Sequence, residues 1–124
     1  TLIHYYANST AIWPSGALNQ AEAMKPNRNI QGKRQRAAEQ SLSKALAALG
    51  QSSDVHALLE DLCTPAELQA LADRWAVAQL LDKGLPYRAI QDRTGVSVTT
   101  VGRVARCLTA GAGGYRKALT ASTR

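Results

Sequence analysis

The fold is decided by residues 85–108, which read LPYRAIQDRTGVSVTTVGRVARCL. A helix of about two turns is predicted over residues 86–94 and ends at Gly95, because glycine lacks the Cβ that clashes in a left-handed turn. Val96 fills the crevice between two helices, and Ser97 caps the second helix through its side-chain oxygen. The stretch therefore predicts a helix-turn-helix.

Apolar side chains on the two helices are spaced to hold them at a steep angle. Ile90 on the first helix meets Val101 on the second, and Val104 or Ala105 packs behind them with Leu108. An unrelated pair of buried helices would share this spacing. It would have no reason to add exposed small side chains and flanking arginines, so we expect the second helix to enter the major groove of DNA.

The predicted DNA contacts come from the start of the second helix and from the basic residues around it. Methyl groups of Thr and Val suit a thymine methyl, and a Thr hydroxyl bonds either base type. The helix N-terminus and the arginines, Arg93 among them, suit phosphates and set the register. The predicted site comprises Tyr87, Arg88, Ser97, Val98, Thr99, Gly102, Arg103 and Arg106.

Charge is divided unevenly along the chain, whose formal net charge is +6. The net charge is +5 over residues 24–50, −4 over residues 51–84 and +6 over residues 85–124. An acidic middle between two basic blocks differs from a surface of mixed signs, and it favours a polyanionic partner.

Upstream of the motif, the pattern predicts three further helices and no strand. Apolar residues recur at helical spacing from Gly32 onward until Gly50 ends the first helix, and Ser53 caps a short second one. The sequence therefore predicts an all-α fold, with a flexible N-terminal arm over residues 1–35 and one helix-turn-helix domain over residues 36–120.

The clearest helix start is Thr64-Pro65-Ala66-Glu67. Thr stands at the N-cap, Pro at the first helical position and Glu at N3, which together form a capping box. Trp75 lies on the apolar face of this helix and is interpreted as a core residue. Lys83-Gly84 ends the helix, with a cation in its last turn and a glycine after it.

Other functional classes find little support. No apolar run approaches the ~18 residues that span a bilayer, and the start lacks the pattern of a secretory signal, so we expect a soluble cytoplasmic protein. Cys63 and Cys107 stand in apolar contexts and are interpreted as reduced core residues. His4 and His56 lie apart without nucleophile–base or metal-ligand spacing, so we expect no catalytic residue, no metal site and no enzyme.

A family resemblance rests on residues 61–64, 67–74, 77–81, 87, 94–97, 100–101, 103–104 and 106–108. Over these residues the chain resembles the tryptophan-repressor superfamily, and most closely the branch called YerC/YecD. The resemblance implies a helical, intertwined homodimer that represses transcription from double-stranded DNA. A dimer of helix-turn-helix units implies a palindromic operator with half-sites roughly one helical turn apart.

The resemblance also raises the question of a tryptophan corepressor. The positions that match corepressor contacts of the family are Thr64, Arg74, Thr100 and Arg103. A pair of arginines suits a planar ligand with a carboxylate. Two residues depart from the family: Val104 replaces a glycine that leaves room for the indole, and Cys107 replaces a serine. The preferred interpretation is that Arg74 pairs with a nearby carboxylate, such as that of Asp73 or Glu67, and that Arg103 binds a phosphate.

Three functions remain open at this point. The leading hypothesis is a sequence-specific DNA-binding repressor that works as a dimer. The second is a repressor that responds to an amino acid, with L-tryptophan or another small effector as cofactor. The third is a helical protein–protein adaptor that does not bind DNA.

Overall fold

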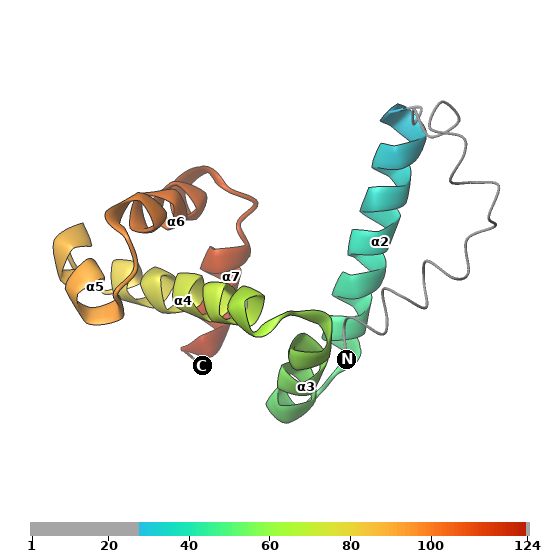
Figure 1. Cartoon of the computed structure of the whole chain (residues 1–124), viewed down its shortest axis with the longest axis horizontal. Helices are drawn as coiled ribbons and strands as arrows, with labels where there is room; N and C mark the ends of the chain where they lie inside the picture. The colour runs from blue at the N-terminus through green and yellow to red at the C-terminus, as the bar shows by residue number, and fades with distance from the viewer. Residues whose placement is uncertain (1–27, 124) are drawn as a thin grey trace. The chain divides into compact units, whose positions relative to one another are not determined.

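The computed structural model describes residues 28–123, and every regular element among them is an α-helix. The helices are α2 (Arg28–Ala48), α3 (Ser52–Leu62), α4 (Pro65–Asp82), α5 (Tyr87–Thr94), α6 (Val98–Ala110) and α7 (Gly114–Ser122) (Figure 1). The predicted all-α class is therefore confirmed. The chain forms two units, residues 1–64 and residues 65–124, which we describe separately.

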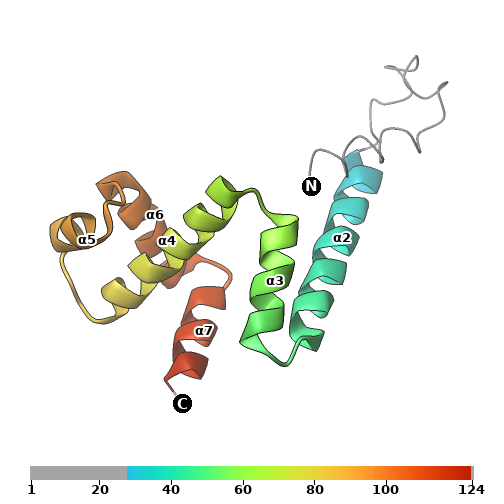
Figure 2. The same cartoon turned by 60° about the horizontal axis from the view of Figure 1, so that its bottom comes forward.

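The described part of the first unit consists of α2 and α3, and neither helix has a buried residue. The chain changes direction in the short connection between them (Figure 2). The first helix begins at Arg28, earlier than the predicted start at Gly32. The flexible arm predicted for residues 1–35 lies mostly outside the described residues, and its last part, residues 28–35, is helical.

The start of α3 differs from the prediction. The helix begins at Ser52, its N-cap is Gln51, and no side chain caps it. Ser53 is therefore a helical residue and not the cap. Ser52, Ser53 and Asp54 are adjacent and all of suitable type for a cap, so residue type alone did not determine the start.

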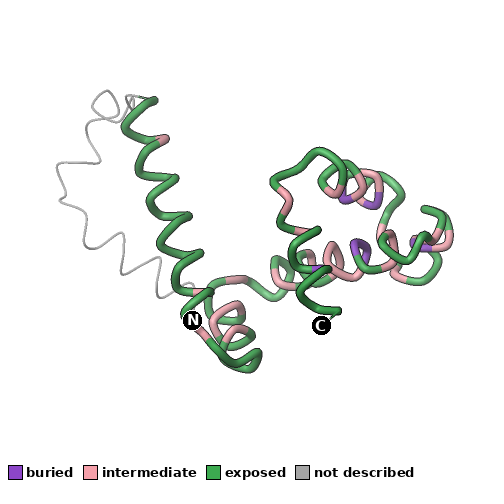
Figure 3. The backbone as a smooth tube through the Cα atoms, turned by 180° about the vertical axis from the view of Figure 1, so that it is seen from behind, coloured by how far each residue is buried: buried purple, intermediate pink, exposed green. Residues whose placement is uncertain are grey.

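The second unit has a small apolar core to which three of its helices contribute. The core cluster consists of Val77 and Ala78 from α4, Ile90 from α5, and Val101 and Val104 from α6. Trp75 is partly buried and packs against this cluster, as predicted. Leu119 from α7 is also buried, and the buried residues of the described chain all lie in this unit (Figure 3).

The end of α4 shows the predicted glycine stop. Gly84 has a φ of 83°. Its N–H donates to the Leu81 carbonyl at 2.9 Å, and the Leu85 N–H donates to the Leu80 carbonyl at 3.2 Å. This pair of bonds is a Schellman motif, which satisfies carbonyls that the helix end would leave without partners. It directs the chain into the helix-turn-helix.

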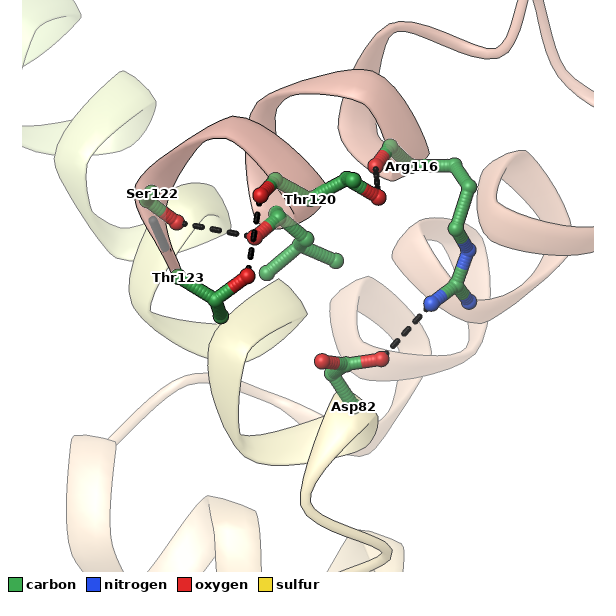
Figure 4. A network of polar contacts seen from close by, with 6 residues as sticks. Asp82, Arg116, Thr120, Ser122 and Thr123 are labelled. Carbon is green, nitrogen blue, oxygen red and sulfur yellow. Dashed lines mark hydrogen bonds and ion pairs between the residues drawn. The ribbon is translucent and has the colours of Figure 1, made fainter.

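An ion pair joins α7 to the end of α4. Arg116 Nη1 lies 2.6 Å from Asp82 Oδ1, and the Thr120 hydroxyl donates to the Arg116 carbonyl within α7 (Figure 4). Ser122 and Thr123 bond to backbone carbonyls in the last turn. The ion pair and the buried Leu119 therefore hold α7 against the helix that precedes the helix-turn-helix.

Candidate nucleic-acid interface

The turn between α5 and α6 has the geometry that its sequence predicts. Gly95 has a φ of 74°, and its N–H donates to the Gln91 carbonyl at 2.8 Å. The side chain of Thr94 gives the turn a second support, which was not predicted from the sequence. The Thr94 hydroxyl donates to the Ile90 carbonyl at 2.7 Å and accepts from the Val96 N–H at 3.1 Å. Thr94 thus links the end of α5 to the turn.

Ser97 caps α6 as predicted. Its Oγ accepts from the Thr100 N–H at 3.2 Å and donates to the Thr100 hydroxyl at 3.1 Å. The cap satisfies one of the N–H groups that a helix start leaves open. The other early N–H groups of α6 and its positive dipole end point out of the helix and suit an anion.

The core sets which face of α6 is exposed. Val101 is fully buried and Val104 is 1% exposed, so these two side chains anchor the helix. The exposed side chains of α6 and its cap include most of the predicted α6 contacts, namely Ser97, Val98, Thr99, Arg103 and Arg106. Val98 alone keeps 43% of its surface exposed. The exposed part of Val98 leaves its methyl groups accessible at the start of the helix, where a thymine methyl could contact them.

The predicted residues of α5 and α6 meet beside Gly102, which is half-buried. A Cβ at Gly102 would lie 3.9 Å from Tyr87 Cε2 and 3.9 Å from Arg106 Nη1. The Tyr87 ring from α5, 43% exposed, therefore stands next to the middle of α6. The two helices thus form one continuous surface of an aromatic ring, small residues and guanidinium groups.

The arginines of this surface form no ion pair with another described residue. Arg88, Arg93, Arg103 and Arg106 are all exposed. Within residues 28–123 the ion pairs are His56–Glu60 and Arg116–Asp82, and neither uses these arginines. Asp92 is the one carboxylate of residues 85–110, so the surface has a strong excess of positive charge.

The predicted ligand residues are dispersed between the two units. Arg74 and Thr100 are half-buried, Arg103 is exposed, and Thr64 is an exposed residue at the end of the first unit. The expected Arg74–Asp73 pair is absent from residues 28–123, where Asp73 accepts from Gln69 Nε2 at 2.8 Å. Val104 lies in the core, at the position where the family resemblance implies room for an indole.

A shallow apolar groove of about 400 Å³ lies on the same unit, between α4, α6 and α7. Its lining includes Trp75, Cys107 and Tyr115. Cys107 is exposed, so its interpretation as a core residue was wrong, whereas Cys63 is half-buried. Both thiols are free.

Among the described residues no His, Cys, Asp and Glu side chains gather into a metal-binding group, and no helix is long and apolar enough to cross a membrane.

The helical fold with a capped helix-turn-helix defines a class of small proteins with the architecture of DNA-binding regulators. The profile of the Trp repressor protein family matches residues 37–123, and the chain belongs to this family. It is 38% identical to YerC of Bacillus subtilis over 78 residues, which cover 63% of this chain and 75% of YerC. The predicted superfamily and branch are thus confirmed.

Two crystal structures have the same fold. A candidate Trp repressor from Staphylococcus aureus is 32% identical, with a TM-score of 0.66, over 70% of this chain and 87% of its own. A TrpR-like protein from Eubacterium eligens is 31% identical, also with a TM-score of 0.66, over 70% of this chain and 90% of its own. These similarities confirm the Trp-repressor-like fold.

Proposed function

We propose that the protein is a sequence-specific DNA-binding regulator that acts as a repressor in the cytoplasm and is not an enzyme. The observation that carries the proposal is the exposed start of α6. Ser97 caps it, Val101 and Val104 anchor it, and it presents Val98 and Thr99 outward. Small side chains at this position approach base edges, while the unpaired arginines neutralise the phosphates on either side.

A homodimer is the second part of the proposal. Neither α2 nor α3 buries a residue, although Leu42 and Leu62 belong to apolar stripes and remain 41% and 45% exposed. Amphipathic helices are stable only when their apolar faces are covered. A second copy would cover them by a symmetric exchange of helices, and two α6 helices would then face half-sites about one helical turn apart.

Selection of bound sequences from a random pool of DNA duplexes tests both parts. The proposal predicts a palindrome with a defined half-site spacing. In a gel shift with the selected duplex, Arg103→Ala should weaken binding, whereas Lys117→Ala on α7 serves as a matched control for the loss of one exposed cation. Affinity should fall steeply with salt. Failure to bind any duplex at low salt would contradict the proposal and would favour the adaptor hypothesis.

A repressor that responds to an amino acid is the second candidate. Arg74 favours it, because this half-buried cation has no ion pair within residues 28–123 and its charge would be offset by a ligand carboxylate. The buried Val104 argues against L-tryptophan, since displacing a fitted side chain costs roughly 1–3 kcal/mol. Titration calorimetry decides: heat at micromolar L-tryptophan would support this candidate, and no heat at millimolar ligand would exclude tryptophan.

A further inference from the structure

The first half of α2 carries cations that the proposed DNA site does not use. These are Arg28, Lys33, Arg34 and Arg36, and all of them are exposed. Residues 28–38 contain no carboxylate. The one acid of α2 is Glu39, whose Oε1 accepts from Gln35 Nε2 at 3.1 Å. This segment, which we call the basic half of α2 (residues 28–36), thus has a net charge of +4.

The cations of the basic half are not paired with other described residues. The ion pairs between residues 28 and 123 are His56–Glu60 and Arg116–Asp82. On an ordinary solvated helix, acids alternate with bases and form pairs at i and i+4. In the basic half, like charges lie close together without acidic partners at i+4, and their repulsion destabilises the isolated helix. A partner with negative charge would remove that repulsion.

The remainder of α2 is different in character. Its large apolar residues, Leu42 and Leu46, lie beyond the basic half, and Leu49 follows directly after the helix. The match to the Trp repressor family begins at residue 37, so the basic half lies outside the part of the chain that the family shares. The helix is thus divided at residue 37 into an apolar part inside the family fold and a basic part outside it.

The geometry of the basic half fits an extended polyanion. From Arg28 to Arg36 the helix rises about 12 Å at 1.5 Å per residue, a length over which a DNA duplex carries about seven phosphate charges. At 100° per residue, the cations at positions 33, 34 and 36 lie within about half of the helix circumference, so their long side chains can reach one duplex. A single carboxylate or one acidic side chain would engage only a fraction of them.

The composition also distinguishes DNA from a membrane surface. A helix that lies on a membrane needs a broad apolar face opposite its cations. Ile30 is the one large apolar residue of the basic half, and it is 51% exposed. Arginine and lysine side chains are also frequent partners of DNA phosphates, a contact that carries no sequence information.

We propose that the basic half of α2 is a second DNA-binding element that contacts phosphates without reading sequence, and this inference rests on the proposed function. A dimer would carry two such elements, because each protomer contributes one copy of the basic half. It would raise the affinity for every duplex and leave the preference for one sequence to α6.

The test is a triple variant of the full chain, Lys33→Gln, Arg34→Gln and Arg36→Gln. Its matched control removes the same number of exposed cations elsewhere, by Lys44→Gln, Lys83→Gln and Lys117→Gln. Glutamine is a good helix former, and the circular dichroism of both variants should match that of the parent chain. Fluorescence anisotropy measures the affinity for the selected duplex and for a scrambled duplex at several salt concentrations.

The triple variant should lose affinity for both duplexes by the same factor, and its salt slope should fall by about 0.9 for each phosphate that it no longer neutralises. For two such phosphates the affinity should fall about 30-fold at 0.15 M salt, if the counterion term vanishes at 1 M. The control should stay within about threefold of the parent chain. An equal decrease in affinity in both variants, or an unchanged salt slope, would overturn the proposal.

Further arms separate this inference from the proposed function. If the parent chain shows no sequence preference but the triple variant still loses affinity for any duplex, the proposed function fails and the second element stands. If the parent chain prefers one sequence and the triple variant keeps the affinity and the salt slope of the parent chain, the proposed function stands and the second DNA-binding element is refuted. Loss of binding to RNA or to anionic vesicles, with DNA binding unchanged, would assign the basic half to that other polyanion and overturn the proposal.

Discussion

The left-handed glycine of the helix-turn-helix gives the sharpest test of the fold. At Gly95 the φ of 74° is a conformation that costs an L-residue about 1–2 kcal/mol. A Cβ built there meets nothing within 4 Å, so no steric clash adds to this cost. Alanine also loses less entropy on folding than glycine, which offsets about 0.4–1 kcal/mol. Gly95→Ala should therefore destabilise the protein by about 1 kcal/mol.

Gly114→Ala is the matched control, because its Cβ also meets nothing within 4 Å and its φ lies outside the left-handed region. It should be neutral or stabilise by up to about 1 kcal/mol. Urea unfolding followed by circular dichroism, at one fixed protomer concentration, measures both. Gly95→Asn should recover much of the stability, since asparagine tolerates the left-handed region. Equal stability of Gly95→Ala and Gly114→Ala would refute the conformational argument.

Three further predictions concern the core, the cap and the α4–α7 link. Ile90→Ala should lower the free energy of unfolding by about 2–5 kcal/mol in the same urea assay, because Ile90 is fully buried in a small core. Ser97→Ala should lower the free energy of unfolding by about 1 kcal/mol, because the hydrogen bond from the Thr100 N–H is lost. Ser97→Asp should keep the free energy of unfolding but weaken DNA binding in a gel shift, because the added carboxylate repels phosphates. Asp82→Asn and Arg116→Gln should each lower the free energy of unfolding by less than about 1 kcal/mol, because the two side chains are 37% and 56% exposed. The coupling energy between them in a double-mutant cycle should decrease as salt is added.

The helix-turn-helix could be predicted from the sequence because local signals determine it. Gly95 can adopt a positive φ without strain, and Ser97 is a residue of cap type directly before an amphipathic stretch. Both signals act over a few residues and require no tertiary contact. The end of α5, the cap of α6 and the core residues Ile90 and Val101 were therefore predicted correctly. The helix α5 begins one residue later than predicted, with Pro86 as its N-cap, and of the alternatives Val104 and Ala105 it is Val104 that lies in the core.

Other features depend on information that a single sequence does not carry. The exposure of Cys107 depends on how α7 approaches α6, because an apolar neighbour in sequence does not say which side of a helix meets the core. The hydrogen bonds of Thr94 depend on the exact turn, although a Thr four residues after Ile90 at a helix end was a usable signal. The basic side chains of residues 24–50 indicated a polyanionic partner from the sequence. The structure adds that those of α2 are exposed on one helix and form no ion pair with another described residue.

The two ends of α6 are linked through one residue. Val104 lies in the core and holds the helix in the register that turns Val98 and Thr99 outward. The family resemblance implies a glycine at this position in members that bind tryptophan. In this protein the side chain of Val104 occupies the space that the indole would otherwise fill. A helix seated by its own valine needs no ligand to reach its DNA-contacting geometry. On the proposed function, we therefore expect the protein to bind DNA in a gel shift without an added amino acid, and a strict requirement for one would contradict this expectation.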